Sequence, residues 1–185
     1  MSLTVGGHKF QLEHQGEEDD LGYRIYWRSQ IAAAPLTTWG RGEDQLGEQP
    51  LPVSFVGNSE APPSPAQRAA FEWLASHLEE ATTRIQAACE NSWRECYFWE
   101  GNEMEDDEEY FIEDIRIPPG ETGEGVNTPR DPALPALIVV DLQQDWEIEH
   151  GFYVVLDPAD AQGDRWTTWD GMTEIGLCCD DDAFT

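Results

Sequence analysis

The clearest alternation of apolar and polar residues in the chain lies in the segment D-W-E-I-E-H-G-F-Y-V-V-L, residues 145–156. A period of two places successive side chains on opposite faces of a β-strand, so this segment predicts a strand with one core face and one acidic face. The run A-L-I-V-V, residues 136–140, is continuously apolar and predicts a fully buried strand beside it. The hydrophobic centre is therefore expected between residues 136 and 156. The expected core face comprises Trp146, Ile148, His150, Phe152, Val154 and Leu156, and the expected acidic face comprises Asp145, Glu147, Glu149 and Gly151.

Shorter patterns predict further strands. The Gly6-Gly7 pair marks a turn before a short alternating segment that carries Phe10 and Leu12. Aromatic and β-branched residues, which pack well on a pleated surface, recur in three other segments. We therefore expect additional strands at residues 21–27, 51–56 and 110–118.

The best helix start in the chain is the S-P-A-Q segment that opens at Ser64. Ser64 is expected as the N-cap, Pro65 as the first helical residue, and Gln67 as the partner that completes a capping box. Neither glycine nor proline occurs in residues 66–100, so the pattern predicts one long amphipathic helix from residue 65 to at least residue 90. Its apolar face is expected to comprise Phe71, Leu74, Leu78, Ala81, Ile85, Ala88 or Cys89, and Ser92.

These elements predict an α+β fold in which a mainly antiparallel sheet packs against one long amphipathic helix. A chain of 185 residues fits one domain, and a domain of this size buries about 70% of the surface that its unfolded chain exposes. We therefore expect a single domain over residues 1–185. Two segments are expected to be loops: the like-charge block at residues 103–109, and residues 118–135, which are rich in proline and glycine.

The charge balance restricts the partners. The chain has 38 Asp+Glu against 10 Lys+Arg, a formal net charge of −28, and Lys9 is its only lysine. Such a chain repels nucleic-acid phosphates and anionic membrane surfaces, and it attracts basic proteins and divalent cations. We therefore expect no nucleic-acid partner and no membrane partner. A salt-adapted proteome, in which proteins are acidic whatever they bind, is another origin of the same composition.

Cysteine usage and the N-terminal segment favour a cytoplasmic protein. Cys89 and Cys96 are seven residues apart on the predicted helix, which separates their Cα atoms by about 10 Å, beyond disulfide reach. Cys178 and Cys179 are adjacent, and on a strand they point to opposite faces. No zinc-ligand spacing occurs, so reduced thiols are expected. The first ten residues do not resemble a signal peptide, and no run approaches the ~20 apolar residues of a membrane span.

The densest group of candidate catalytic or metal-ligating side chains consists of Asp145, Glu147, Glu149 and His150. Because carboxylates and histidine ligate divalent cations and act as acid and base, a metal-binding or metal-dependent hydrolytic protein that uses Glu147, Glu149 and His150 is an alternative function. The strand phase, however, places His150 on the face opposite both glutamates. The G-x-S-x-G, glycine-rich phosphate-loop and H-E-x-x-H motifs are absent from the sequence. We therefore expect a protein that is not an enzyme and that requires no cofactor and no metal.

The segment W-E-I-E-H-G-F, residues 146–152, resembles the W-D-x-E-H-G signature of a bacterial family of uncharacterised domains. In that family a strand-rich N-terminal part precedes an S-P-x-Q helix start, and the signature lies near the C-terminus, as in this chain. Glu147 stands where the family usually has Asp, and the acidic block at 103–109 is not part of the family pattern. The family has no established activity, but its members resemble the small proteins encoded beside polymorphic toxins. The resemblance therefore implies an immunity role, and it implies that Trp146, Glu149, His150 and Gly151 form a structural signature.

Charge and resemblance together predict an immunity-type protein that binds and neutralises a cognate basic toxin, with a nuclease as one such toxin. A nuclease has a basic groove for its substrate, and an acidic protein can occupy that groove by presenting carboxylates in place of phosphates. An acidic adaptor with no toxin partner is a further alternative. The expected contact residues are Glu103, Glu105, Asp106, Asp107, Glu108 and Glu109 of the acidic block, the exposed Glu147 and Glu149, and the aromatic anchors Trp166 and Trp169.

Overall fold

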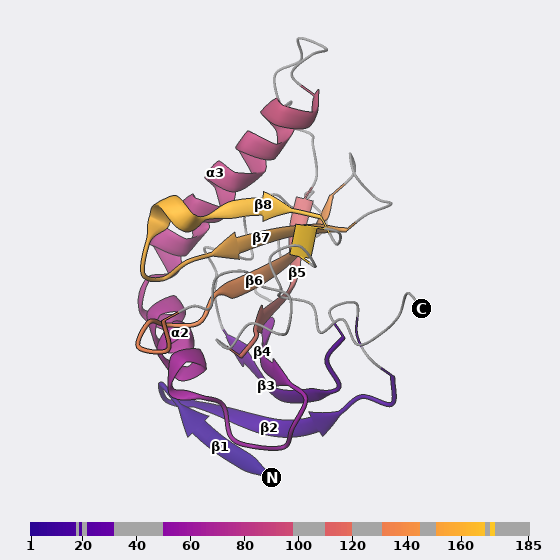
Figure 1. Ribbon diagram of the computed structural model, residues 1–185, viewed down its shortest axis with the longest axis vertical. Helices are drawn as coiled ribbons and strands as arrows, with labels where there is room; N and C mark the ends of the chain where they lie inside the picture. The colour runs from indigo at the N-terminus through magenta and orange to yellow at the C-terminus, as the bar shows by residue number, and fades with distance from the viewer. Residues whose placement is uncertain are drawn as a thin grey trace.

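The computed structural model describes residues 1–17, 19, 22–31, 50–97, 110–119, 131–144, 151–168 and 171–172. In this part of the chain, eight β-strands form one sheet in sequence order, and two α-helices lie along it (Figure 1). The strands are β1 (Ser2–Val5), β2 (His8–His14), β3 (Ile25–Ile31), β4 (Leu51–Gly57), β5 (Tyr110–Ile117), β6 (Ile138–Gln144), β7 (Phe152–Leu156) and β8 (Arg165–Thr167). The helices are α2 (Pro65–Ser76) and α3 (Leu78–Tyr97), and a short 3₁₀ helix, η3 (Ala161–Gly163), precedes β8.

Neighbouring strands are antiparallel except for β4 and β5, which run parallel. Between these two strands the chain passes through α2 and α3, and such a crossover is what a parallel pair requires. In this pair Val53 is the register partner of Ile115, and Phe55 is the partner of Ile117. The sheet curls so that its edge strands, β1 and β8, lie at opposite ends of the molecule (Figure 1).

The predicted fold class is wrong in two respects. The described chain is mostly sheet, and that sheet is mixed, because β4 and β5 are parallel among otherwise antiparallel neighbours. In place of one long helix there are two shorter ones, which are separated at His77. The first error arises because hydrophobic periodicity locates a strand but carries no information about the direction of its partner.

The start of α2 confirms the predicted capping box. The backbone N–H of Gln67 donates to Ser64 Oγ at 3.2 Å, and the backbone N–H of Ser64 donates to Gln67 Oε1 at 3.0 Å. Pro65 occupies the first turn, where its missing N–H costs no intrahelical hydrogen bond.

The helical segment breaks at His77, where hydrogen bonds and ring contacts of nearby side chains replace main-chain hydrogen bonds. His77 has φ −130° and ψ 39°, and its N–H donates to Leu74 O, which tightens the last turn of α2. The imidazole stacks on Trp73, with ring centroids 5.5 Å apart, and the Ser76 hydroxyl donates to Glu72 O at 2.7 Å. These contacts stabilise a helix end without glycine or proline. The chain then resumes with the Ala81 N–H donating to His77 O at 2.8 Å.

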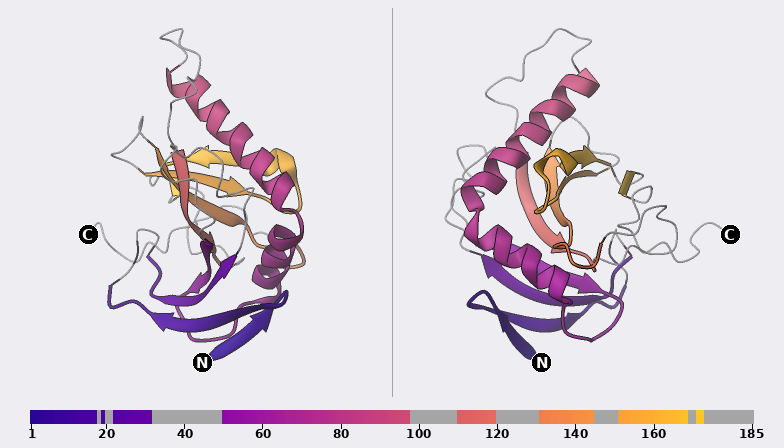
Figure 2. Two further views of the ribbon diagram at one scale, coloured as in Figure 1. Left: turned by 180° about the vertical axis from the view of Figure 1, so that it is seen from behind. Right: turned by 60° about the vertical axis from the view of Figure 1, so that its left-hand side comes forward.

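The two helices cover one face of the sheet, and between them and that face lies the main core. Figure 2 shows α2 and α3 following one another along the same side of the sheet, α2 toward β1 and α3 toward β7 and β8. The predicted apolar face is confirmed: Phe71, Leu74, Ala81, Ile85, Ala88, Cys89 and Ser92 are buried, and Leu78 packs partly buried against the same core. Alternate residues of each strand meet this face, including Phe10, Phe55, Ile115, Val140 and Val154.

The opposite face of the sheet carries a second, smaller core that the alternation did not predict. Tyr153 and Val155 of β7 are buried there, although the pattern assigned their side of the strand to acidic residues. This face is therefore partly closed, and burial on both sides explains why all five residues of β7 are buried. The cluster comprises Tyr23, Tyr26, Val56, Val139, Tyr153, Val155 and Met172.

Several predicted features lie outside the described residues. These are the acidic block at 103–109, most of the loop at 118–135, and the first part of the alternating segment, residues 145–150. Cys89 is a free, buried cysteine. Across the described ranges, no helix combines the length and the hydropathy needed to span a membrane.

Candidate functional site

Most of the predicted contact and signature residues fall outside the part of the chain that the structure describes. They are Glu103, Glu105, Asp106, Asp107, Glu108, Glu109, Trp146, Glu147, Glu149, His150 and Trp169. Their roles stay predictions. Trp166 and Gly151 are described.

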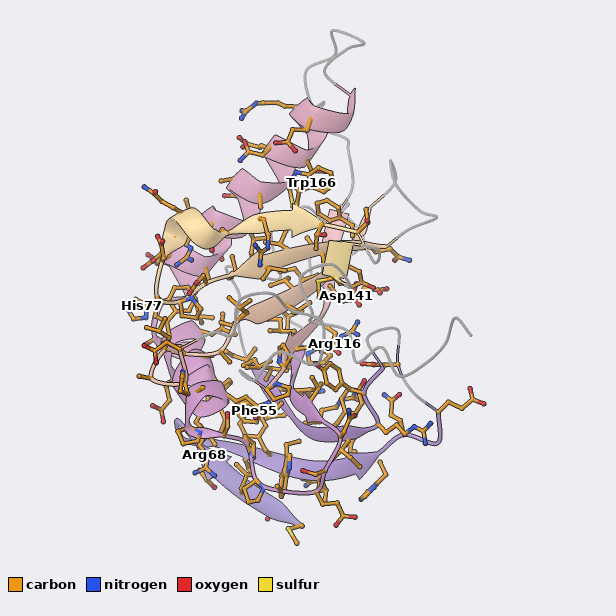
Figure 3. The ribbon with its side chains drawn as sticks, in the orientation of Figure 1. Phe55, Arg68, His77, Arg116, Asp141 and Trp166 are labelled. Atoms are coloured by element: carbon orange, nitrogen blue, oxygen red, sulfur yellow. The ribbon has the colours of Figure 1, made fainter. Side chains whose placement is uncertain are left out.

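Trp166 lies on the edge strand β8 and joins it to α3 (Figure 3). The indole Nε1 donates to Glu95 Oε2 at 2.9 Å, and the ring stacks on Phe152 with centroids 6.1 Å apart. The side chain is half-buried and packs against the main core. Its surface is therefore only partly available to another protein, and its role as an anchor stays a prediction.

The structure explains why glycine occupies the last position of the W-E-I-E-H-G segment, Gly151. Its φ of +66° lies in the left-handed region, and a Cβ at this position would lie 3.2 Å from the ring of Tyr153. Both constraints favour glycine. The extended backbone of β7 begins directly after it.

A cluster of charged side chains is buried on the face of the sheet away from the helices. Arg116 of β5 lies at its centre and is 5% exposed. Arg116 Nη1 donates to Asp19 Oδ2 at 3.2 Å, and Nη2 donates to Asp141 Oδ2. Its Nε lies 3.7 Å from Asp114 Oδ2. The Tyr26 hydroxyl donates to the same Asp19 oxygen. One arginine thus faces carboxylates from the β2–β3 connection, β5 and β6, and Figure 3 shows Arg116 and Asp141 together near the middle of the sheet.

Burial raises the pKa of Asp114 to about 6. Arg116, Arg28 and the Ile115 backbone N–H act in the opposite direction because each favours the ionised carboxylate, whereas the charge of Asp19 raises the pKa further. Asp114 is therefore ionised at neutral pH only at a cost to the folded state.

We expect the stability difference between the wild-type protein and Asp114→Asn to depend on pH. The folded-state pKa lies above the unfolded value of 3.8, so the folded protein binds more protons between about pH 4 and pH 6, and wild-type stability falls as pH rises through that window. Asparagine keeps an oxygen for the Ile115 N–H and does not ionise. The variant should match the wild type near pH 4 and exceed it by about 3 kcal/mol near pH 7.5.

Urea denaturation at a series of pH values measures this difference. Asp160→Asn is the control, because Asp160 is exposed and its carboxylate likewise accepts a backbone N–H. A stability difference for Asp114→Asn that stays constant from pH 4 to pH 7.5 would contradict the raised pKa.

A second arginine is held by a different set of contacts, where α3 meets the β7–β8 connection. Arg84 Nε and Nη2 donate to the two oxygens of Asp164 at 2.6 Å each, and Nη2 also donates to Asp157 O at 2.6 Å. The guanidinium lies 4.9 Å from the centroid of the Trp73 ring. The hydrogen bond with Asp164 raises the pKa of Arg84. This bidentate pair fixes α3 to the end of the sheet.

With these two arginines paired within the fold, much of the acidic charge remains on the outside. The α3 residues Glu79, Glu90 and Glu95 are exposed, as is Glu72 of α2. Glu90 pairs with the exposed Arg94, and Glu95 accepts the hydrogen bond of Trp166 at the edge of the sheet. The negative charge therefore faces possible partners, while Arg84 and Arg116 compensate carboxylates within the fold.

Gln67 joins the start of α2 to the ends of both parallel strands. Its Nε2 donates to Val56 O at 3.0 Å and to Ile117 O at 2.8 Å, while its Oε1 accepts the N–H of Ser64. The side chain is 5% exposed. One amide thus satisfies three backbone groups where β4, β5 and α2 meet, and a cavity opens beside it.

In the described ranges, no group of three or more His, Cys, Asp or Glu side chains is arranged to hold a metal ion. Arg116 occupies the position among three carboxylates that a cation would need. The alternative site at Glu147, Glu149 and His150 lies outside the described residues.

Comparison of the chain with protein-family models, with curated proteins and with solved structures finds no significant match. The resemblance of residues 146–152 to the W-D-x-E-H-G family therefore stays a prediction.

Sequence reasoning missed the Arg116 cluster and the role of Gln67 beyond the capping box. A signal was present for Arg116, because it lies between Ile115 and Ile117 in a strand whose alternation places it opposite the core. A charged residue on the far side of such a strand indicates a buried pair when the second face is also covered. No local signal identifies Asp19 as its partner, since the two are 97 residues apart.

Proposed function

We propose that this protein is an immunity-type inhibitor that binds and neutralises a basic protein, a cognate toxin. The observation that carries the proposal is the placement of its charge. The net charge is −28, Arg84 and Arg116 are paired within the fold, and the two helices present exposed glutamates.

Charge of this kind acts mainly on the rate of encounter. Electrostatic steering raises association rate constants to about 10⁸–10⁹ M⁻¹s⁻¹ at low salt. A fast encounter suits an inhibitor that must bind a toxin before the toxin reaches its target. The residues 103–109 contribute six carboxylates to this charge, and they remain the proposed centre of contact.

The expected result is a complex with the protein encoded by the adjacent gene whose association rate depends on salt. The association rate constant should fall about tenfold or more between about 0.05 and 0.5 M NaCl. At the higher concentration, salt screens the attraction between exposed charges that are more than a few ångströms apart. Co-purification followed by stopped-flow or surface-plasmon measurements tests both parts.

A matched pair of variants separates the acidic block from net charge. In one variant Glu103, Glu105, Asp106, Asp107, Glu108 and Glu109 become Gln or Asn; in the other Glu17, Glu72, Glu79, Glu90, Glu113 and Asp160 are changed in the same way. Both variants have the same net charge, so a contact role for residues 103–109 predicts the larger loss of affinity for the first variant. Equal losses of affinity would show that residues 103–109 are not in the interface. If no complex forms with the wild-type protein, the immunity function is contradicted.

A further inference from the structure

A cavity of about 630 Å³ lies outside the carboxyl ends of the parallel strands β4 and β5. Its walls come from β3, from the connection between β4 and α2, and from residues 131–134. Phe55 and Trp27 supply aromatic surface, and Pro62, Pro63 and Pro132 supply rigid apolar surface. The crevice at this end of parallel strands is a common place for ligands in sheets with a crossover helix.

Several polar groups around the cavity are already paired within the protein. Gln67 holds the carbonyls of Val56 and Ile117, and Trp27 Nε1 donates to Ala61 O at 3.1 Å. At the helix start, Ser64 Oγ accepts the Gln67 N–H, and Pro65 has no N–H. Two of the usual donors for a phosphate at a helix N-terminus, those of residues 65 and 67, are therefore missing or occupied.

The charged groups argue against an anion and for a cation. Among the described residues that line the cavity, none is lysine or arginine, whereas Asp131 is a carboxylate on its rim. Asp131 is exposed, whereas Glu60, which lies between the lining residues Ser59 and Ala61, has its carboxylate 3.6 Å from His14 Nε2. A ligand that brings positive charge to this rim gains from the Asp131 carboxylate.

The rim also exposes apolar surface. Leu134 is 39% exposed and, with Met1, is one of two large apolar side chains exposed in the described chain. A preformed apolar pocket with a rigid wall binds without much loss of side-chain entropy. The cavity can therefore bury an apolar group of a ligand, and a positively charged group beside it on the ligand would lie near the Asp131 carboxylate.

We propose that this cavity binds a short apolar segment of the basic protein partner, one in which lysine or arginine flanks the inserted side chains. The proposal rests on the proposed function, which makes the partner a basic protein. A volume of about 630 Å³ is within the range of small-ligand sites and accommodates two or three side chains. The segment is an anchor, and the outer acidic surface guides its approach.

The test is a titration of the full-length ¹⁵N-labelled protein with three capped tetrapeptides. The first, K-F-L-K, has apolar centre and positive flanks; K-S-S-K keeps the charge, and E-F-L-E keeps the apolar centre. We expect K-F-L-K to shift the amides of Gly57, Ala61, Gln67 and Leu134, with a Kd of about 1 mM or below. The other two should bind about tenfold more weakly or not at all.

Two variants separate the apolar and the electrostatic contributions to peptide binding. Leu134→Ser should weaken K-F-L-K about fivefold by removing apolar contact. Asp131→Asn should weaken it about threefold at low salt and have no effect near 0.5 M NaCl. Asp160→Asn is a matched control, because Asp131 and Asp160 are both exposed and each accepts a backbone N–H from two residues ahead at 2.9 Å. Asp160→Asn should leave the Kd of K-F-L-K unchanged.

Equal binding of K-S-S-K, shifts confined to other parts of the protein, or no binding of K-F-L-K at several millimolar would each overturn the proposal. The peptide titration uses no toxin, so its failure does not touch the proposed function. If the complex with the adjacent gene product forms and Leu134→Ser leaves its Kd unchanged, the cavity is excluded as the anchor site while the function stands. If peptides bind as expected but no complex exists, the function fails and the cavity remains a binding site.

Discussion

Replacing Arg116 with glutamine is expected to lower the free energy of unfolding by about 3–5 kcal/mol, the range for breaking a buried charge cluster from one side. Arg116 is 5% exposed, and without it the carboxylates of Asp19, Asp114 and Asp141 repel one another where little water reaches them. Repulsion between ionised carboxylates weakens when they bind protons. The loss should therefore be smaller near pH 5 than near pH 8.

Urea denaturation at both pH values measures this effect. Arg94→Gln is the matched control, because Arg94 is exposed and pairs with the exposed Glu90 within α3; it should cost about 0.5 kcal/mol or less. Adding Asp141→Asn to Arg116→Gln should restore part of the lost stability, since it removes one of the repelling charges. A loss near 0.5 kcal/mol for Arg116→Gln, with no pH dependence, would mean that the cluster is exposed to solvent.

Replacing Gln67 with methionine is expected to lower the free energy of unfolding by about 2–4 kcal/mol. Methionine has a similar length but no hydrogen-bonding amide, so the carbonyls of Val56 and Ile117 and the N–H of Ser64 lose their partner together. Each unpaired buried backbone group costs about 1–3 kcal/mol, and partial access of water at the cavity reduces the sum.

Denaturation of three variants separates this role from ordinary capping. Ser64→Ala removes only the other half of the capping box and should cost about 1 kcal/mol. Gln162→Met, at an exposed position of η3, should be nearly neutral. If Gln67→Met costs no more than Ser64→Ala, the bonds to the two strand ends do not contribute to stability.

The sequence by itself determined the features that depend on neighbours a few residues apart. The S-P-A-Q segment identified the start of α2 because a capping box closes within four residues. The spacing of Phe71, Leu74, Ala81 and Ile85 identified the buried helix face, and continuous apolar residues identified β6. The acidic character of the surface likewise followed from composition, because charge counts do not depend on the fold.

The tertiary structure alone decided the features that depend on distant partners. The stacking of His77 on Trp73 is local, but the directions that α2 and α3 take on either side of it follow the curled sheet, which no local pattern encodes. The parallel direction of β5 beside β4 results from the crossover, and it creates the strand ends that Gln67 joins.

The buried charges show the same division most clearly. Arg116 alternates with Ile115 and Ile117 along β5, so the pattern alone assigns its side of the strand to solvent, whereas Asp141 follows the continuously apolar residues 136–140 and carries no such signal. Only folding brings Asp19 across from the β2–β3 connection and adds the second core of tyrosines and valines beside them. Whether a charged side chain faces water or a buried partner depends on what covers it, and that cover comes from segments far away in the sequence.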